Sequence, residues 1–126
     1  MAIDPENPNH AFVSFSGYSA YTPTTPGHVF DVRYHRDSGT ATWTDLSFNL
    51  GDMPVTGIAL DSATGTLYAA TDFGVASLHA GGHHWRTAAS GLPFVAVYGI
   101  AIDSAARVLY SATHGRGIWS LDLSSD

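Results

Sequence analysis

The sequence has no lysine and no cysteine, and few charged residues of either sign. Only 13% of its 126 residues are charged, whereas an average soluble domain carries about 25%. The five cations are all arginines scattered along the chain, and the formal net charge is -6. Nucleic acids and anionic membrane surfaces are bound through clusters of cations. The sequence offers no such cluster, so we expect neither nucleic acid nor membrane as a partner.

The absence of cysteine excludes three further kinds of chemistry. Without thiols the chain has no disulfide framework, no thiolate metal site and no cysteine nucleophile. Apolar runs are also short, and none approaches the roughly 18 residues that a membrane-spanning helix needs. No pattern indicates a bound cofactor, and we predict none.

A short motif recurs along the chain. The tripeptide Ala-Ile/Leu-Asp ends at Asp4, at Asp61 and at Asp103, and the last two copies each follow Gly-Ile. After each aspartate a turn leads to further short apolar runs. The first unit is longer than the second, and the excess falls mostly in the stretch 16–27, which is rich in Pro, Tyr, Ser and Thr. Self-similarity of this kind indicates a repeat architecture.

The runs within each unit have the pattern of β-strands. They are short, rich in β-branched and aromatic residues, and bounded by turn residues. No segment keeps a helical apolar period, so no helix is predicted. Four strands per unit, in units of about 40 residues, are typical of β-propeller blades, which pack face to face around an axis. The alternative is an irregular β-sandwich.

We therefore predict an all-β chain that forms one β-propeller segment. It contains about three four-stranded antiparallel blades, of which the first and last are incomplete, with eleven strands in total. The blades span about residues 1–53, 54–93 and 94–126. We expect their large aromatic residues to be buried between sheets. These are Trp43, Trp85 and Trp119, together with Tyr68 and Tyr110.

The third unit resembles a known family. Residues 109–119 read LYSATHGRGIW, which is similar to the blade end LYAATHGRGIW of the BNR-like and sortilin-like β-propeller superfamily, also described as WD40/YVTN/BNR-like repeat proteins. Residues 91–93 and 71–75 resemble its GLP and TDxGV elements. The resemblance covers nearly the whole chain and points to the C-terminal blades of longer bacterial proteins. It implies a propeller fold and an extracellular or periplasmic location, but its members range from sialidases to proteins without known activity, so it implies no single function.

Three blades fill only part of a ring, since propellers close with about 4 to 8 blades. The two end sheets would each expose an apolar face, and an outer strand edge would lack lysine as protection against pairing. We therefore predict a homo-oligomer, in which the first unit of one copy meets the third unit of another and two copies form a ring of six blades. The alternative is that the chain is a piece of a larger propeller.

The loop at 16–27 is the first candidate binding site. It carries Tyr18 and Tyr21, and it is longer than the corresponding turns of the other units. Tyrosines offer flat apolar faces with a polar tip, which suits binding of a glycan or a peptide. The alternative is that the loop only shields the channel or packs on a neighbouring blade.

The turn at 113–117 is the second candidate. It carries His114 and Arg116, and arginine suits recognition of carboxylate or phosphate groups. The alternative is that Arg116 binds backbone carbonyls or an aspartate of the next blade. Asp72, at the equivalent turn of the second unit, is the natural partner of Arg116 of the same chain or of a second copy. His79, His83 and His84 have no carboxylate near in sequence, so we interpret them as surface histidines and predict no metal site.

No pattern indicates catalysis. Glycoside hydrolysis needs two carboxylates roughly 5 to 10 Å apart, and only Asp52 and Asp72 are expected on the ligand side. No Gly-x-Ser-x-Gly turn indicates a serine nucleophile. We therefore predict a non-catalytic propeller module that acts as a structural or interaction scaffold. The first alternative is a carbohydrate- or peptide-binding, lectin-like propeller, and the second is a fragment of a glycoside hydrolase.

Overall fold

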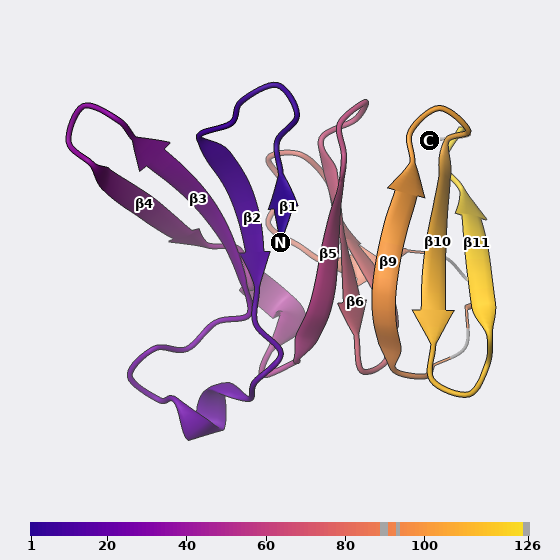
Figure 1. Ribbon diagram of the computed structural model, residues 1–126. Coiled ribbons are helices and arrows are strands. Elements are labelled where there is room, and N and C mark those ends of the chain that lie inside the picture. Colours follow the sequence, from indigo (N-terminus) through magenta and orange to yellow (C-terminus); the bar gives the residue numbers. More distant parts are fainter. Residues whose placement is uncertain (89–90, 93, 125–126) are drawn as a thin grey trace.

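The computed structural model describes residues 1–88, 91–92 and 94–124, which form an all-β structure of three antiparallel sheets (Figure 1). The described residues contain eleven strands and no α-helix, as the sequence predicts. No helix among them is long and apolar enough to cross a membrane.

Each sheet is built from consecutive strands. The first sheet contains, in order, β1 (Ala2–Ile3), β2 (His10–Ser14), β3 (Val29–His35) and β4 (Thr40–Asp45). The second contains β5 (Val55–Asp61), β6 (Thr66–Thr71), β7 (Gly74–Leu78) and β8 (Arg86–Thr87). The third contains β9 (Val97–Asp103), β10 (Val108–Thr113) and β11 (Ile118–Asp122), with β10 in the middle. Two 3-10 turns, η1 (Ser19–Tyr21) and η2 (Phe48–Leu50), lie in the connections.

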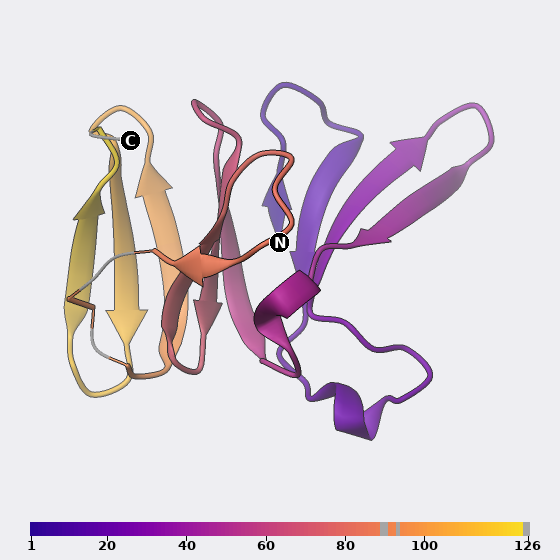
Figure 2. The same cartoon turned by 180° about the vertical axis from the view of Figure 1, so that it is seen from behind.

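The sheets stand side by side. β5 contacts β1 and β2 on one side and β9 on the other. Figures 1 and 2 show β3 and β4 splaying away from the second sheet, so the first two sheets are close at their first strands and diverge outward. We call the end with the β5–β6 and β9–β10 turns the upper end, and the end with the loop 15–28 the lower end, as they stand in Figure 1.

Two apolar clusters hold the sheets together. The first lies between the first and second sheets and includes Phe12, Val29, Leu67, Leu78 and Trp85. The second lies between the second and third sheets and includes Tyr68, Ala70, Val75, Val97 and Leu109. Because side chains alternate along a strand, the second sheet contributes one face to each cluster. It is therefore covered on both faces, whereas each outer sheet is covered on one.

The uncovered faces of the outer sheets carry many apolar side chains. The first end face is the side of the first sheet turned away from the second. By strand register it carries Ile3, Ala11, Val13, Phe30, Val32, Tyr34, Ala41 and Trp43, and one charged residue, Asp45. The third end face is the corresponding side of the third sheet. It carries Ala101, Tyr110, Ala112 and Ile118, together with the polar residues Asp103, Ser120 and Asp122. Ile118 is 76% exposed and Trp43 is 53% exposed, so both faces present large apolar side chains to solvent.

The expected burial of five aromatic residues is confirmed for two and is wrong for three. Trp85 and Tyr68, on the second sheet, are each 3% exposed. Trp43 and Tyr110 are exposed because they lie on the end faces, where no described sheet covers them. Trp119 lies on the same side of β11 as Leu121, which packs toward the second sheet. Its ring is nevertheless 39% exposed, because β11 is the edge strand of its sheet.

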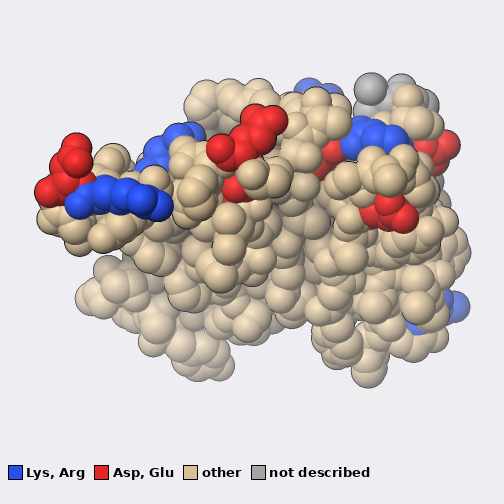
Figure 3. Space-filling view, turned by 45° about the horizontal axis from the view of Figure 1, so that its top comes forward, with Lys and Arg blue, Asp and Glu red and all other residues tan. Residues whose placement is uncertain are grey.

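An ion pair joins the second and third sheets at the upper end. Arg107 Nη2 donates to Asp61 Oδ2 at 2.9 Å, and Nη1 donates to Oδ1 of the same carboxylate. Asp61 is 2% exposed and also accepts a hydrogen bond from the Thr64 hydroxyl at 2.9 Å. The charged side chains visible in Figure 3 lie mostly over this end. Besides apolar packing, the second and third sheets are thus joined by this ion pair at the upper end and, at the starts of β5 and β9, by a hydrogen bond from the Thr56 hydroxyl to the Val97 carbonyl at 2.6 Å.

Candidate functional site

The long loop between β2 and β3 is held in place by Asp52, which lies just before β5. Its carboxylate accepts hydrogen bonds from the backbone N–H groups of Ser19 at 2.6 Å and Ala20 at 3.3 Å. These N–H groups open η1 and have no partner within that turn. The hydrogen bond from Ser19 lowers the pKa of Asp52 below its usual value, and the bonds from His28 and Ala20 act in the same direction.

His28 connects the two ends of this loop and is only 1% exposed. Its Nε2 lies 2.8 Å from Asp52 Oδ1 and 3.2 Å from Ser19 Oγ, and its Nδ1 lies 3.2 Å from the Phe15 carbonyl oxygen. Sequence reasoning did not single out His28, because a lone histidine before a strand belongs to no motif. The structure shows that it ties together the start, the turn and the end of the loop.

Ser19, His28 and Asp52 are the residue types of a catalytic triad, but they do not have its geometry. In a triad the serine and the aspartate bind opposite nitrogens of the imidazole. Here Ser19 Oγ and Asp52 Oδ1 both face Nε2. Ser19 Oγ also accepts a hydrogen bond from the Gly27 N–H at 3.2 Å. The cluster therefore fixes the loop and does not activate the hydroxyl group.

Two of the predicted site residues contact each other. The Tyr18 hydroxyl donates to Asp72 Oδ2 at 3.4 Å, which links the loop to the β6–β7 turn of the second sheet. The charge on Asp72 raises the pKa of the Tyr18 phenol, and the charge on Asp52 adds to this effect. Tyr21 packs edge-on against Tyr18, with ring centroids 6.5 Å apart, and is 84% exposed. Tyr18, Tyr21 and Asp72 thus form one group at the lower end.

The other two predicted site residues lie on the third sheet, in the β10–β11 turn. The His114 N–H donates to the Ala96 carbonyl at 2.8 Å, and its ring lies 5.3 Å from that of Tyr98. The Arg116 carbonyl accepts a hydrogen bond from Trp119 Nε1 at 2.9 Å. No ion pair joins Arg116 to Asp72 within the described part of a single chain. The structure therefore does not bring this turn together with the tyrosines.

A cavity of about 640 Å³ opens between the loop and the first end face. Phe15, Phe30 and Trp43 line it from the sheet, and Tyr18 and Tyr21 line it from the loop. Phe30 packs edge-on against both Phe15 and Trp43, with ring centroids 5.7 and 5.8 Å away. The three rings form a continuous aromatic wall. We call this space the aromatic cavity.

Gly27 allows the loop to close over the aromatic wall. Its φ is +118°, and a Cβ there would lie 2.5 Å from Phe30 Cζ. Sequence reasoning identified the tyrosines of the cavity and missed Phe15, Phe30 and Trp43. The signal was present, because β-strand alternation places Phe30 and Trp43 on the same face of the first sheet.

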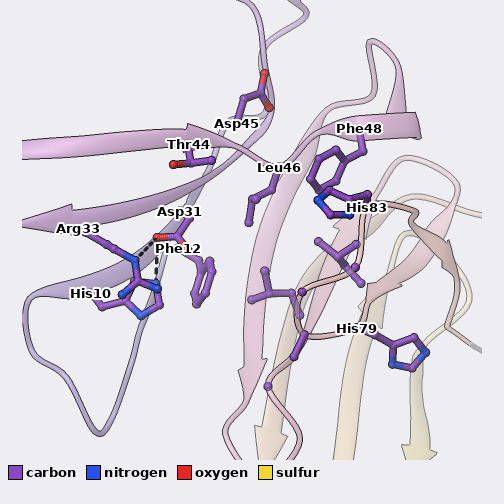
Figure 4. A pocket seen from close by; sticks show the side chains of 16 residues that line it. His10, Phe12, Asp31, Arg33, Thr44, Asp45, Leu46, Phe48, His79 and His83 are labelled. Carbon is purple, nitrogen blue, oxygen red and sulfur yellow. Dashed lines mark hydrogen bonds and ion pairs between the residues drawn. The ribbon is translucent and has the colours of Figure 1, made fainter.

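A second cavity, of about 480 Å³, lies between the first and second sheets (Figure 4). On its wall, the two ring nitrogens of His10 each lie 3.0 Å from a carboxylate oxygen, one of Asp4 and one of Asp31. His83 packs against Phe48, and Figure 4 shows His79 pointing in a different direction. Within the described ranges no three potential metal ligands converge, here or elsewhere.

Comparison with known proteins does not add a relative. No family model, no curated protein and no solved structure matches the chain. The resemblance to the BNR-like superfamily therefore stays a prediction from the repeat motifs, and function has to be argued from the sheets, their faces and the aromatic cavity.

Proposed function

We propose that the chain is a non-catalytic β-propeller module of BNR-like type, whose three sheets are blades, and that it self-assembles into a closed ring that serves as an interaction scaffold. The supporting observation is a correspondence between buried and exposed faces. Each end face occupies the repeat positions that are buried on the second sheet.

The third end face corresponds to the side of the second sheet that packs on the third. In the second sheet Ala59 lies opposite Tyr68, and this pair faces the third sheet. In the third sheet Ala101 lies opposite Tyr110 in the same register, and both are exposed. A side that is buried against a neighbouring sheet in one repeat is therefore free in the next.

The first end face corresponds to the opposite side of the second sheet. Leu60 lies opposite Leu67 and faces the first sheet, and the equivalent pair in the first sheet is Ile3 opposite Ala11. The tryptophans correspond in the same way: Trp85 is buried on this side of the second sheet, and its equivalent Trp43 lies on the first end face. The two end faces are thus the two halves of a sheet-to-sheet contact that occurs twice within the chain.

Docking the third end face of one copy on the first end face of another would repeat this contact. The contact is heterologous, and it closes when the rotation between sheets completes a circle. Two copies give six sheets, which is within the range of about 4 to 8 blades in closed propellers, and three copies give nine, which is outside it. We therefore favour a two-copy ring.

The test is the mass in solution of the wild-type chain and of Ile118→Asp. We expect a species of twice the 13.3 kDa chain mass by light scattering at micromolar concentration. A carboxylate buried without a partner costs at least about 3 kcal/mol, which weakens association more than about 100-fold. Ala105→Asp places the same charge in the exposed β9–β10 turn and should leave the dimer intact. A wild-type chain that stays monomeric and well folded would overturn the proposal.

The aromatic cavity supports a second candidate function, binding of a carbohydrate or peptide by a lectin-like propeller. A cavity of about 640 Å³ is within the usual size range of ligand pockets, about 300 to 1,000 Å³, and such pockets are lined mainly by aromatic and apolar side chains. The test is binding of β-glucan oligosaccharides and sialyllactose, compared with a chain carrying Tyr18→Ala and Tyr21→Ala. Loss of binding in this variant would support the candidate, and unchanged binding would contradict it.

A further inference from the structure

Trp85 is held by the segment that connects the first and second sheets. Its indole Nε1–H donates to the Leu46 carbonyl at 2.7 Å. Its backbone N–H donates to Asn49 Oδ1 at 2.6 Å, and its backbone carbonyl accepts a hydrogen bond from Asn49 Nδ2 at 3.0 Å. One leucine carbonyl and one asparagine side chain, three residues apart, therefore bind three groups of a single tryptophan.

Trp43 has the same three groups, and none of them has a hydrogen-bond partner in the part of the chain that the structure describes. β4 is an edge strand, and the Leu46 N–H donates to the Val29 carbonyl at 2.8 Å. Hydrogen-bonded pairs alternate along an antiparallel ladder, so Trp43, three residues before Leu46, points its backbone N–H and carbonyl away from β3. Among the described residues, neither these groups nor the Trp43 indole N–H makes a hydrogen bond. The matching residue of the second sheet is Trp85, which directly precedes β8 and whose backbone groups face Asn49.

The space beside Trp43 is open where the space beside Trp85 is filled. The aromatic cavity, at about 640 Å³, includes Trp43 in its wall. The pocket beside Trp85 measures about 220 Å³, and Asn49 and Leu50 of the connecting segment form part of its wall. The first sheet therefore has a surface like the one that binds Leu46–Asn49 on the second sheet, and no described segment covers it.

We propose that the aromatic cavity binds a peptide segment of a partner chain in which leucine and asparagine stand three residues apart. The asparagine amide would bridge the backbone N–H and carbonyl of Trp43, and the leucine carbonyl would accept the indole N–H. The apolar side chains of the segment would cover Phe30 and Phe15. Leu46–Asn49, which already binds Trp85 in this way, is the chemical template for the ligand.

This inference names a ligand class for the peptide-binding candidate above and does not depend on self-assembly. No described segment of the third sheet is equivalent to Leu46–Asn49, so the described residues of a second copy docked on the first end face would leave the three groups of Trp43 to another ligand. The cavity and the ring can therefore be tested separately.

The probe is an acetylated and amidated peptide with the sequence of residues 45–51, Asp-Leu-Ser-Phe-Asn-Leu-Gly. The readout is the indole N–H resonance of Trp43 in the ¹⁵N-labelled chain, assigned by its disappearance in Trp43→Phe. We expect a saturable shift at submillimolar to millimolar peptide. The same peptide with alanine in place of asparagine should bind at least tenfold more weakly.

The titration is run on the wild-type chain and on Ile118→Asp, and the mass is measured in the same samples. A saturable, asparagine-dependent shift in either chain supports the inference, whatever the mass. Absence of a shift in both chains up to several millimolar peptide overturns it, and so does equal binding of the alanine peptide. Binding of an oligosaccharide without binding of the peptide would keep the second candidate function and overturn this inference.

Discussion

The ion pair between Arg107 and Asp61 combines two opposing contributions, which the variant Arg107→Gly separates. Arg107 has a φ of +57°, a left-handed conformation that costs a side-chain-bearing residue about 1 to 2 kcal/mol. The equivalent residue in the β5–β6 turn is Gly65, with a φ of +75°. Arginine therefore stands where the other repeat has glycine, and we attribute this to its bidentate bond to a buried carboxylate.

The expected loss of unfolding free energy depends on which hydrogen bonds Asp61 retains in Arg107→Gly. Removing one partner of a buried ion pair costs about 3 to 5 kcal/mol. Asp61 retains hydrogen bonds from the Thr64 hydroxyl at 2.9 Å and the Ala63 N–H at 3.2 Å, which favours the lower value of about 3 kcal/mol. Glycine recovers about 1 kcal/mol of backbone strain. We expect Arg107→Gly to lose about 2 kcal/mol of unfolding free energy and Arg107→Ala about 3.

The assay is urea unfolding at pH 7 at one fixed chain concentration, because self-association would add to the apparent stability. A glycine variant as stable as the wild type, or less stable than the alanine variant, would refute the reasoning.

The dependence of stability on pH gives an independent check. The hydrogen bond from Arg107 lowers the pKa of Asp61 below its usual value. A lowered pKa stabilises the fold above the pKa of the unfolded chain, about 3.9, and this contribution is lost as the pH falls through the lower folded value. The stability difference between wild type and Arg107→Gly should therefore be constant above about pH 5 and narrow below about pH 4.

Three further predictions concern the tryptophans and the loop at the lower end. Trp85→Phe should lower the unfolding free energy by about 1 to 2 kcal/mol because the half-buried Leu46 carbonyl loses its donor. Trp43→Phe at the exposed equivalent should change the unfolding free energy by less than about 0.5 kcal/mol. Urea unfolding measures both, and equal losses would contradict the difference in burial. Replacing Tyr18 and Tyr21 with alanine should leave the unfolding temperature nearly unchanged, and a large decrease by calorimetry would instead favour a packing role for the loop. Asp52→Ala removes the acceptor of two loop N–H groups, so limited proteolysis should cut the loop faster than in the wild type, and an unchanged rate would contradict the anchoring role.

Much of the fold could be predicted because strand patterns are local. Short apolar runs between turn residues predicted eleven strands in three sets, and the described residues form eleven strands in sheets of four, four and three. Burial was less predictable, because it depends on which face of which sheet has a neighbour. Trp43 and Trp85 occupy equivalent positions, yet one is 53% exposed and the other 3%. Their difference arises from packing between sheets, which no local pattern encodes.

The candidate site was predicted in part for the same reason. The tyrosines could be identified from the length and composition of their loop. The contacts that fix the loop come from Asp52 and His28, which are 24 residues apart and meet only when the first and second sheets are in place. The sequence predicted Arg116, of the same chain or of a second copy, as the partner of Asp72, whereas within the described chain the Tyr18 hydroxyl contacts it. The partners in such long-range polar pairs have no characteristic separation in the sequence, so the pairs cannot be recognised from a motif.

The divergence of the sheets favours a ring over an open filament. A heterologous contact between flat, parallel sheets would continue indefinitely, whereas a rotation at each contact brings the chain of sheets back toward its start. The first strands β1 and β5 are in contact, and the outer strands β3 and β4 splay away from the second sheet (Figure 2). Each such contact therefore rotates one sheet relative to the next about an axis on the side of the first strands. A junction between copies that uses the same apolar positions would rotate the next sheet in the same direction. If copies join through the junction proposed above, we expect discrete particles with a mass of two chains. Fibres whose length grows with concentration would mean that the junction differs from the contacts within the chain.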